Sequence, residues 1–152
     1  MIKIKVRKSS INKVRSNLRK INNSSILEGA KVGSMEIMQI IMDESTSEAE
    51  CPYDTRTLVS TAHIEKPQVT NSKILTYAGY AGKKDKMNPK TGLMASAYAE
   101  KVHETPGTPP GGGYYHPHGK WKFLSDPFLR HVNEVVNVIG EQIRIRLRST
   151  TP

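Results

Sequence analysis

The sequence predicts an α+β fold: a small mixed or antiparallel sheet of about four strands, packed by a long helix in the N-terminal half and an amphipathic helix at the C-terminus. Apolar residues recur every three or four positions early in the chain and again at its end, which is the period of a helix. Short alternating segments between them, separated by Gly, Pro and Asn, are typical of strands and turns. A chain of 152 residues can bury its own core, and we expect one domain over residues 1–152.

The N-terminal residues 2–6, IKIKV, alternate apolar and basic side chains, which predicts a strand with one buried face. Ser9 or Ser10 can cap a following helix, because a serine hydroxyl accepts a hydrogen bond from a free first-turn amide. The run Asn-Asn-Ser-Ser at residues 22–25 predicts the end of that helix and a cap for the next. The apolar stripe of the first helix consists of Ile11, Val14, Leu18 and Ile21.

A second helix is predicted from Ile26 to about Ser45. Gly29 and Gly33 lie four positions apart inside it, and each weakens a helix by about 1 kcal/mol relative to alanine. The two glycines are either tolerated at that cost or they let another backbone approach closely. One face of this helix consists of Leu27, Ala30, Ser34, Met38 and Ile41, with Met35 and Met42 beside it.

The stretch after this helix, CPYDTRTL at residues 51–58, is typical of a turn. Pro52 stops the helix, and Asp54 or Thr55 can cap the turn that leads into the next strand. The following residues, up to position 82, predict two strands joined around Pro67 to Asn71 as a hairpin.

Beyond the hairpin, the polar residues 83–92 predict a loop. The next segment, LMASAYAEKVHE, suits either a strand or a helix by propensity, and we favour extended structure for Tyr98 to His103. Residues 105–119 are too rich in Pro and Gly for regular structure and predict an extended loop. The last helix is predicted with Asp126 as its N-cap and Pro127 as its first residue. Its apolar stripe consists of Leu129, Val132, Val135, Val136, Ile139, Ile143 and Leu147.

Charge divides the N-terminal third of the chain. Residues 1–27 contain eight Lys or Arg and no acid, whereas residues 28–50 contain six acids and one lysine. Such a basic arm faces nucleic acid or an acidic protein surface, or it is simply a solvated face. The candidate interface residues are Lys3, Lys5, Arg7, Lys8, Arg15, Arg19, Asp43, Glu44 and Glu48.

The histidines do not form a metal-binding motif. A zincin helix needs His-Glu-x-x-His, so that both ligands share one face, but His103-Glu104 is followed by Thr-Pro-Gly. His116 and His118 are separated by a proline inside the predicted loop, which is a poor base for a rigid ligand set. We therefore predict no metal, no cofactor and no catalytic residues.

Cys51 is the single cysteine, so the chain contains no internal disulfide, as is usual for folding in a reducing cytoplasm. We expect a buried or half-buried thiol, since no basic partner for it is evident in the sequence. No Gly-rich phosphate loop is present, and no apolar run reaches the roughly 18 residues that a membrane span needs. The sequence thus gives no positive reason to expect an enzyme.

From residue 51 onwards the chain presents CPYDTRTLVSTAHI, a hairpin, YAEKVHE and GKWKFLSDPF before the last helix. This order resembles small head–tail connection proteins of tailed bacteriophages, the neck or tail-completion proteins, also labelled minor capsid or minor tail components. Arg56 stands where that family usually has glycine, and the insert at 105–119 is unusually rich in Pro and Gly. The resemblance covers nearly the whole chain. The matching positions are Pro52, Asp54, Thr55, Leu58, Tyr98, Ala99, Val102, His103, Glu104, Lys122, Phe123 and Leu124.

The resemblance implies that these motif residues are caps and core, and that function lies in surfaces. Copies would form a ring in the virion neck, assembled in the host cytoplasm. Its neighbours would be the head connector or adaptor and the tail terminator or tail tube, with non-specific proximity to genomic DNA and no membrane contact. The basic arm, the acidic stretch 43–50 and the loops 83–92 and 105–119 would supply the contacts. The alternative is a small basic nucleic-acid-binding protein.

Overall fold

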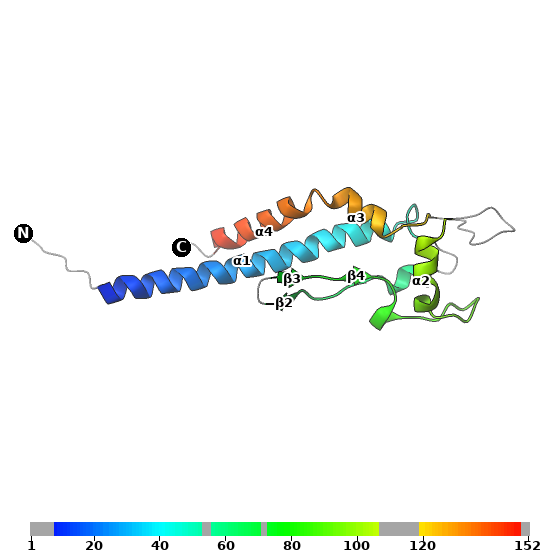
Figure 1. Cartoon of the computed structure of the whole chain (residues 1–152), viewed down its shortest axis with the longest axis horizontal. Coiled ribbons are helices and arrows are strands. Elements are labelled where there is room, and N and C mark those ends of the chain that lie inside the picture. The colour runs from blue at the N-terminus through cyan, green and yellow to red at the C-terminus, as the bar shows by residue number, and fades with distance from the viewer. Residues whose placement is uncertain (1–7, 53–55, 71–72, 107–118, 150–152) are drawn as a thin grey trace, which may run out of the picture.

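The computed structural model describes residues 8–52, 56–70, 73–106 and 119–149, and between residues 8 and 22 it describes the backbone and the side chain of Ser16. One long helix runs through the centre of an elongated molecule (Figure 1). Two helices lie along one side of it, and a β-hairpin lies along the other. The fold therefore belongs to the predicted α+β class. The strand predicted at residues 2–6 lies outside the described residues.

The central helix, α1 (Lys8–Ser45), is continuous over 38 residues, a length of about 57 Å at a rise of about 1.5 Å per residue. The predicted break at residues 22–25 is therefore wrong. Asn and Ser each cost only about 0.5 kcal/mol inside a helix, and Ser25 is buried, so packing outweighs that cost. The helix ends at Ser45 as predicted, and the hydroxyl of Thr46 then donates to the carbonyl of Met42 at 2.8 Å.

The predicted C-terminal helix consists of two helices, α3 (Ser125–His131) and α4 (Val135–Ser149). Asp126 is not the N-cap, because α3 begins one residue before it. Pro127 is the third helical residue, where its missing N–H still costs no intrahelical hydrogen bond. A turn closed by the N–H of Glu134 and the carbonyl of His131, at 2.9 Å, separates the helices. This bend lets α3 pack on the end of α1 while α4 runs back along it (Figure 1).

The two helices α1 and α4 pack in contact at Gly29 and Gly33. A Cβ atom at Gly29 would lie 2.5 Å from the Cα of Ile143, and one at Gly33 would lie 2.6 Å from the Cα of Ile139. Any side chain at either position would therefore push α4 away. Of the two interpretations that the sequence leaves open, close approach of another backbone is confirmed.

The predicted hairpin is confirmed, but the single sheet of about four strands is not. In the described residues, β1 (His63–Ile64) pairs with β4 (Ala78–Gly79), and β2 (Gln68–Thr70) pairs with β3 (Lys73–Leu75), as two separate antiparallel ladders. The register shifts by one residue between them, since Ile64 faces Ala78 whereas Gln68 faces Leu75. Pro67 lies in this bulge rather than in the turn, and it interrupts the ladder because it has no N–H to donate.

Residues Ala95–Glu104 form a helix, α2, so the extended structure predicted for Tyr98 to His103 is wrong. Apolar side chains at positions 95, 98, 99 and 102 follow the helical period. The carboxylate of Asp85 accepts hydrogen bonds from the Ser96 N–H, at 3.0 Å, and from the Ser96 hydroxyl. An acid eleven residues away thus supplies the start signal that the residue before the helix does not provide.

The core lies where the end of α1, the hairpin, α2 and α3 meet. Phe123 is 1% exposed at its centre. Its ring meets the rings of Tyr80 and His103 edge-on, each with centroids 5.1 Å apart. The buried members are Cys51, Leu58, Ala81, Ala95 and Phe123.

Candidate interaction surfaces

The three family-like motifs, far apart in the sequence, meet in this core. Leu58 and Phe123 are buried members of it. The other motif residues that pack against it are Tyr98, Ala99, Val102 and Leu124. These positions are structural, so they leave the outer faces of the molecule as the places where it can meet other molecules.

His103 joins α2 to the start of α3. Its main-chain carbonyl accepts the N–H of Lys122 at 2.8 Å, and its ring Nε2 accepts the N–H of Ser125 at 3.3 Å. Its Nδ1 lies 2.6 Å from a carboxylate oxygen of Glu104, which assigns the ring proton to Nδ1. The His-Glu pair therefore fixes a helix junction, whereas His116 and His118 lie outside the described residues.

The sequence alone does not predict a buried polar network around Ser45. The hydroxyl of Ser45 donates to the carbonyl of Phe123 at 2.6 Å, and it lies 2.6 Å from the hydroxyl of Tyr80. Because a serine has one hydroxyl proton, Tyr80 donates to Ser45. This network ties the end of α1 to the hairpin and to α3. Its partners lie 35 and 78 residues from Ser45, so no local sequence signal announces it.

Cys51 is fully buried, as expected. Burial raises the pKa of its thiol to about 12 and raises the pKa of Tyr80 well above its ordinary value. Both groups are therefore protonated at neutral pH. Since the thiolate is the nucleophilic form of cysteine, Cys51 acts here as a small core residue.

Arg56 has a backbone conformation that glycine favours. Pro52 is buried, and Asp54 and Thr55 lie outside the described residues. Arg56, which stands where the resembled family has glycine, has a φ of +56°. This left-handed conformation costs a non-glycine residue about 1 kcal/mol. The Arg56 side chain forms a surface ion pair with Glu48, one of the candidate interface residues.

Glu44, another candidate interface residue, is engaged inside the molecule. It lies 2.7 Å from Arg130 and 2.6 Å from His131, and it thereby holds α3 against α1. Glu50 extends the cluster, at 2.7 Å from Arg130 and 3.1 Å from Lys120. Partial burial disfavours the Glu44 carboxylate, but hydrogen bonds from His131 and Arg130 outweigh it and lower the pKa of Glu44. Hydrogen bonds with Glu134 and Glu44 raise the pKa of His131.

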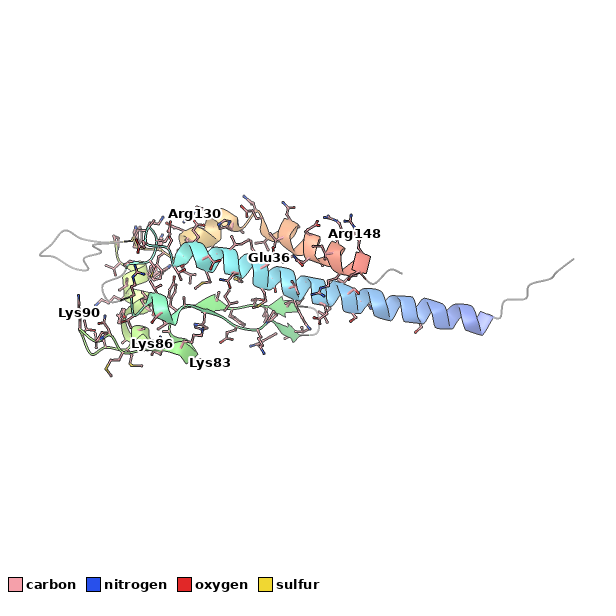
Figure 2. The ribbon with its side chains drawn as sticks, turned by 180° about the vertical axis from the view of Figure 1, so that it is seen from behind. Glu36, Lys83, Lys86, Lys90, Arg130 and Arg148 are labelled. Carbon is pink, nitrogen blue, oxygen red and sulfur yellow. The ribbon has the colours of Figure 1, made fainter. Side chains whose placement is uncertain are left out.

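Glu36 lies on α1 midway along the molecule (Figure 2). Glu36 and Asp43, seven residues further along α1, are both exposed. Asp43 accepts a hydrogen bond from Gln39 at 2.6 Å, and Glu36 accepts one from Gln142 at 2.8 Å. Neither carboxylate forms an ion pair with any residue that the structure describes. This part of the acidic stretch is therefore available to a basic partner.

Two clefts of similar size flank α1. The first, the methionine cleft, has a volume of about 350 Å³ and lies between α1 and β1. Its lining includes Met35, Gln39, Met42, Asp43, Ile64 and Lys84. The second cleft, of about 360 Å³, lies between α1, the hairpin and α3. Its lining is mostly apolar and includes Met38, Ile41, Tyr77, Leu124 and Phe128.

Residues 8–22 of α1, here called the arm, project beyond the rest of the fold. Gly29 meets Ile143 and Gly33 meets Ile139 in antiparallel order, which places the end of α4 level with about residue 23 of α1. Neither α4 nor the hairpin continues alongside the arm (Figure 1). The arm contains Lys8, Arg15 and Arg19, whereas Lys3, Lys5 and Arg7 lie outside the described residues.

The end of the molecule opposite the arm carries the predicted loop at residues 83–92, where Lys83, Lys86 and Lys90 lie (Figure 2). It is partly ordered by a bridge between Met87 and Met94. Met87 is 62% exposed. Apolar and basic side chains therefore occur together on this surface.

In the described residues, no group of three His, Cys, Asp or Glu side chains is placed to hold a metal ion. Within the same residues, no helix combines the length and apolar character that crossing a membrane needs. Comparisons of the chain with protein-family models, curated proteins and solved structures find no match.

Proposed function

We propose that the chain is a structural protein of the neck of a tailed bacteriophage, where a ring of copies joins or completes the connection between the head connector and the tail. The observation that carries this proposal is the convergence of the three motifs on one core. Leu58, Val102 and Phe123 belong to segments that follow one another in the family's order, and all three contribute to the same cluster.

The backbone at Arg56 adds support. The family's motif has glycine at this position, and the chain adopts there the left-handed conformation that glycine favours. The backbone at residue 56 would therefore suit a glycine, although the residue here is arginine. In this proposal the protein makes and breaks no covalent bond, and its outer surfaces bind neighbouring copies and the adjoining head and tail proteins.

A phage that carries a nonsense mutation in the gene for this chain tests the proposal. We expect DNA-filled heads and complete tails that remain separate, and we expect the wild-type chain supplied from a plasmid to restore joined particles. Infectious particles assembled without the chain would contradict the proposal, as would absence of the chain from purified wild-type virions.

The basic segment at residues 1–27 also suits the alternative, a small nucleic-acid-binding protein, because it contains eight basic residues and no acid. Filter binding of DNA across a salt series separates the two functions. A neck protein should show weak, sequence-independent binding that falls steeply with salt. Tight binding to a defined site at physiological salt would favour the alternative.

A further inference from the structure

The arm is a helix that the described part of its own chain does not cover. Its 15 residues include five Lys or Arg and no acid. Apolar residues at positions 11, 14, 18 and 21 share one face of a helix by their spacing. An isolated helix of this length is marginal in water, and its apolar face gains stability when another surface covers it. The arm therefore has the composition of a segment that binds in a groove.

The methionine cleft has the complementary properties. Its lining combines the partly exposed Met35 and Ile64 with polar residues that include His63, and methionine adapts readily to the shape of a bound helix. Asp43 lies on its α1 side, and the exposed Glu36 lies seven residues before it on α1, with no ion pair to any described residue. Lys84 is on the hairpin side, so the acidic rim is confined to α1.

The arm cannot reach the methionine cleft of its own chain. About 24 residues of one continuous helix separate Arg15 from Gln39, which is a distance of about 36 Å. A second copy must therefore supply the cleft. Contact between different surfaces of two identical chains is heterologous, and such contacts close into rings when the rotation between copies allows it.

We propose that the arm of one copy binds in the methionine cleft of the next. Its apolar stripe packs on Met35 and Ile64, and its basic residues face Glu36 and Asp43. This inference rests on the proposed function in one respect, because it names the contact through which copies would form the neck ring. The contact itself follows from the charge, exposure and geometry of the two surfaces.

A charge-swap experiment with the full-length chain tests the contact. One variant carries Glu36→Lys and Asp43→Lys, and the other carries Arg15→Glu and Arg19→Glu. We expect each variant alone to self-associate at least about tenfold more weakly than the native chain in sedimentation velocity at low salt. Mixing the two should restore association, because each variant's arm then meets a cleft of opposite charge. Glu100→Lys, a single charge reversal on an exposed residue of α2, should leave association unchanged.

Site-specific cross-linking gives a second readout. Cys51 is the sole cysteine and is fully buried, so any disulfide between two chains comes from the introduced cysteines. Chains with Leu18→Cys should form disulfide-linked pairs with chains carrying Gln39→Cys, and not with chains carrying Glu100→Cys. Circular dichroism of each variant checks that it is folded. A native chain that stays monomeric up to its solubility limit, or a charge-swap mixture that neither associates nor cross-links, would overturn the proposal.

The two proposals can fail separately. A neck ring whose arms contact something other than the methionine cleft would remove this inference and leave the proposed function intact. Association through the arm by a chain that is absent from virions would do the reverse.

Discussion

The two parts of α1 belong to one continuous helix, yet the rest of the molecule surrounds only one of them. From about residue 23 to Ser45, α1 is flanked by α4, α3 and the hairpin (Figure 1), and Ile37, Ile41 and Ser45 are at most 2% exposed. The arm, residues 8–22, extends past these elements with a basic composition and no acid. The C-terminal part of α1 therefore forms the centre of the fold, whereas its N-terminal part projects beyond the fold.

This contrast separates stability from association. Substitutions in the covered part of α1 and its partners should lower the free energy of unfolding, whereas substitutions in the arm should change self-association and leave unfolding nearly unaffected.

Phe123→Ala should have the largest effect on folding. It removes the most buried ring of the core, and such truncations cost about 3–5 kcal/mol. Urea unfolding followed by circular dichroism measures the change. Phe128→Ala is the matched control, since Phe128 is 41% exposed and is the chain's only other phenylalanine. Equal losses from the two substitutions would contradict the assigned core.

Gly29→Ala should destabilise the covered half by about 1–3 kcal/mol, because the new Cβ would overlap the backbone of α4. Gly140→Ala is the control: a Cβ there meets nothing within 4 Å, so the better helix propensity of alanine should stabilise by up to about 1 kcal/mol. Opposite signs for the two changes in one unfolding assay are the expected result, and a stabilising Gly29→Ala would refute the close helix contact.

Arg56→Gly should stabilise the chain by about 1 kcal/mol relative to Arg56→Ala. Both variants lose the ion pair with Glu48, and only glycine relieves the left-handed backbone. Thermal unfolding of the pair isolates the backbone effect. A more stable alanine variant would show that residue 56 does not adopt positive φ.

The cluster around Glu44 should make stability depend on pH from two directions. The raised pKa of His131 means that its contribution is complete below its ordinary value of 6.5 and is lost as pH rises through the raised value. The lowered pKa of Glu44 means that its contribution is complete above 4.5 and is lost as pH falls through the lowered value. His131→Gln should therefore flatten the decline in melting temperature as the pH rises above about 6.5, and an unchanged slope would contradict the assignment.

Arg15→Glu combined with Arg19→Glu should change the free energy of unfolding least, by no more than about 0.5 kcal/mol, because the arm lies outside the core. The same unfolding assay applies, performed at high salt so that association does not contribute. A large loss of stability would show that the arm packs on its own chain.

Local patterns predicted the parts of the fold that local residues determine. The end of α1 at Ser45, the hairpin and the buried Cys51 follow from periodicity, turn residues and composition. Long-range contacts determine the other features. Packing by α4 keeps α1 helical through residues 22–25, and Asp85, in a loop eleven residues away, caps the start of α2. The apolar spacing in α2 follows the helical period, but the propensities of its residues suit a strand equally well.

The candidate surfaces also combine features that the sequence predicts with features that depend on long-range contacts. The opposite charges of residues 1–27 and 28–50 were evident, and they remain the basis of the proposed contact. Which acids are available could not be predicted, because Glu44 meets Arg130 and His131 only after α3 folds back across 86 and 87 residues of chain. The methionine cleft likewise arises only when β1 docks on α1.

Electron microscopy of virions whose genome encodes this chain tests whether copies of the chain form a ring in the neck. We expect a closed ring of copies between the head connector and the tail, in which each long helix extends its N-terminal end to the adjacent copy. A density map of the complete neck in which other proteins explain every subunit would contradict the proposed ring.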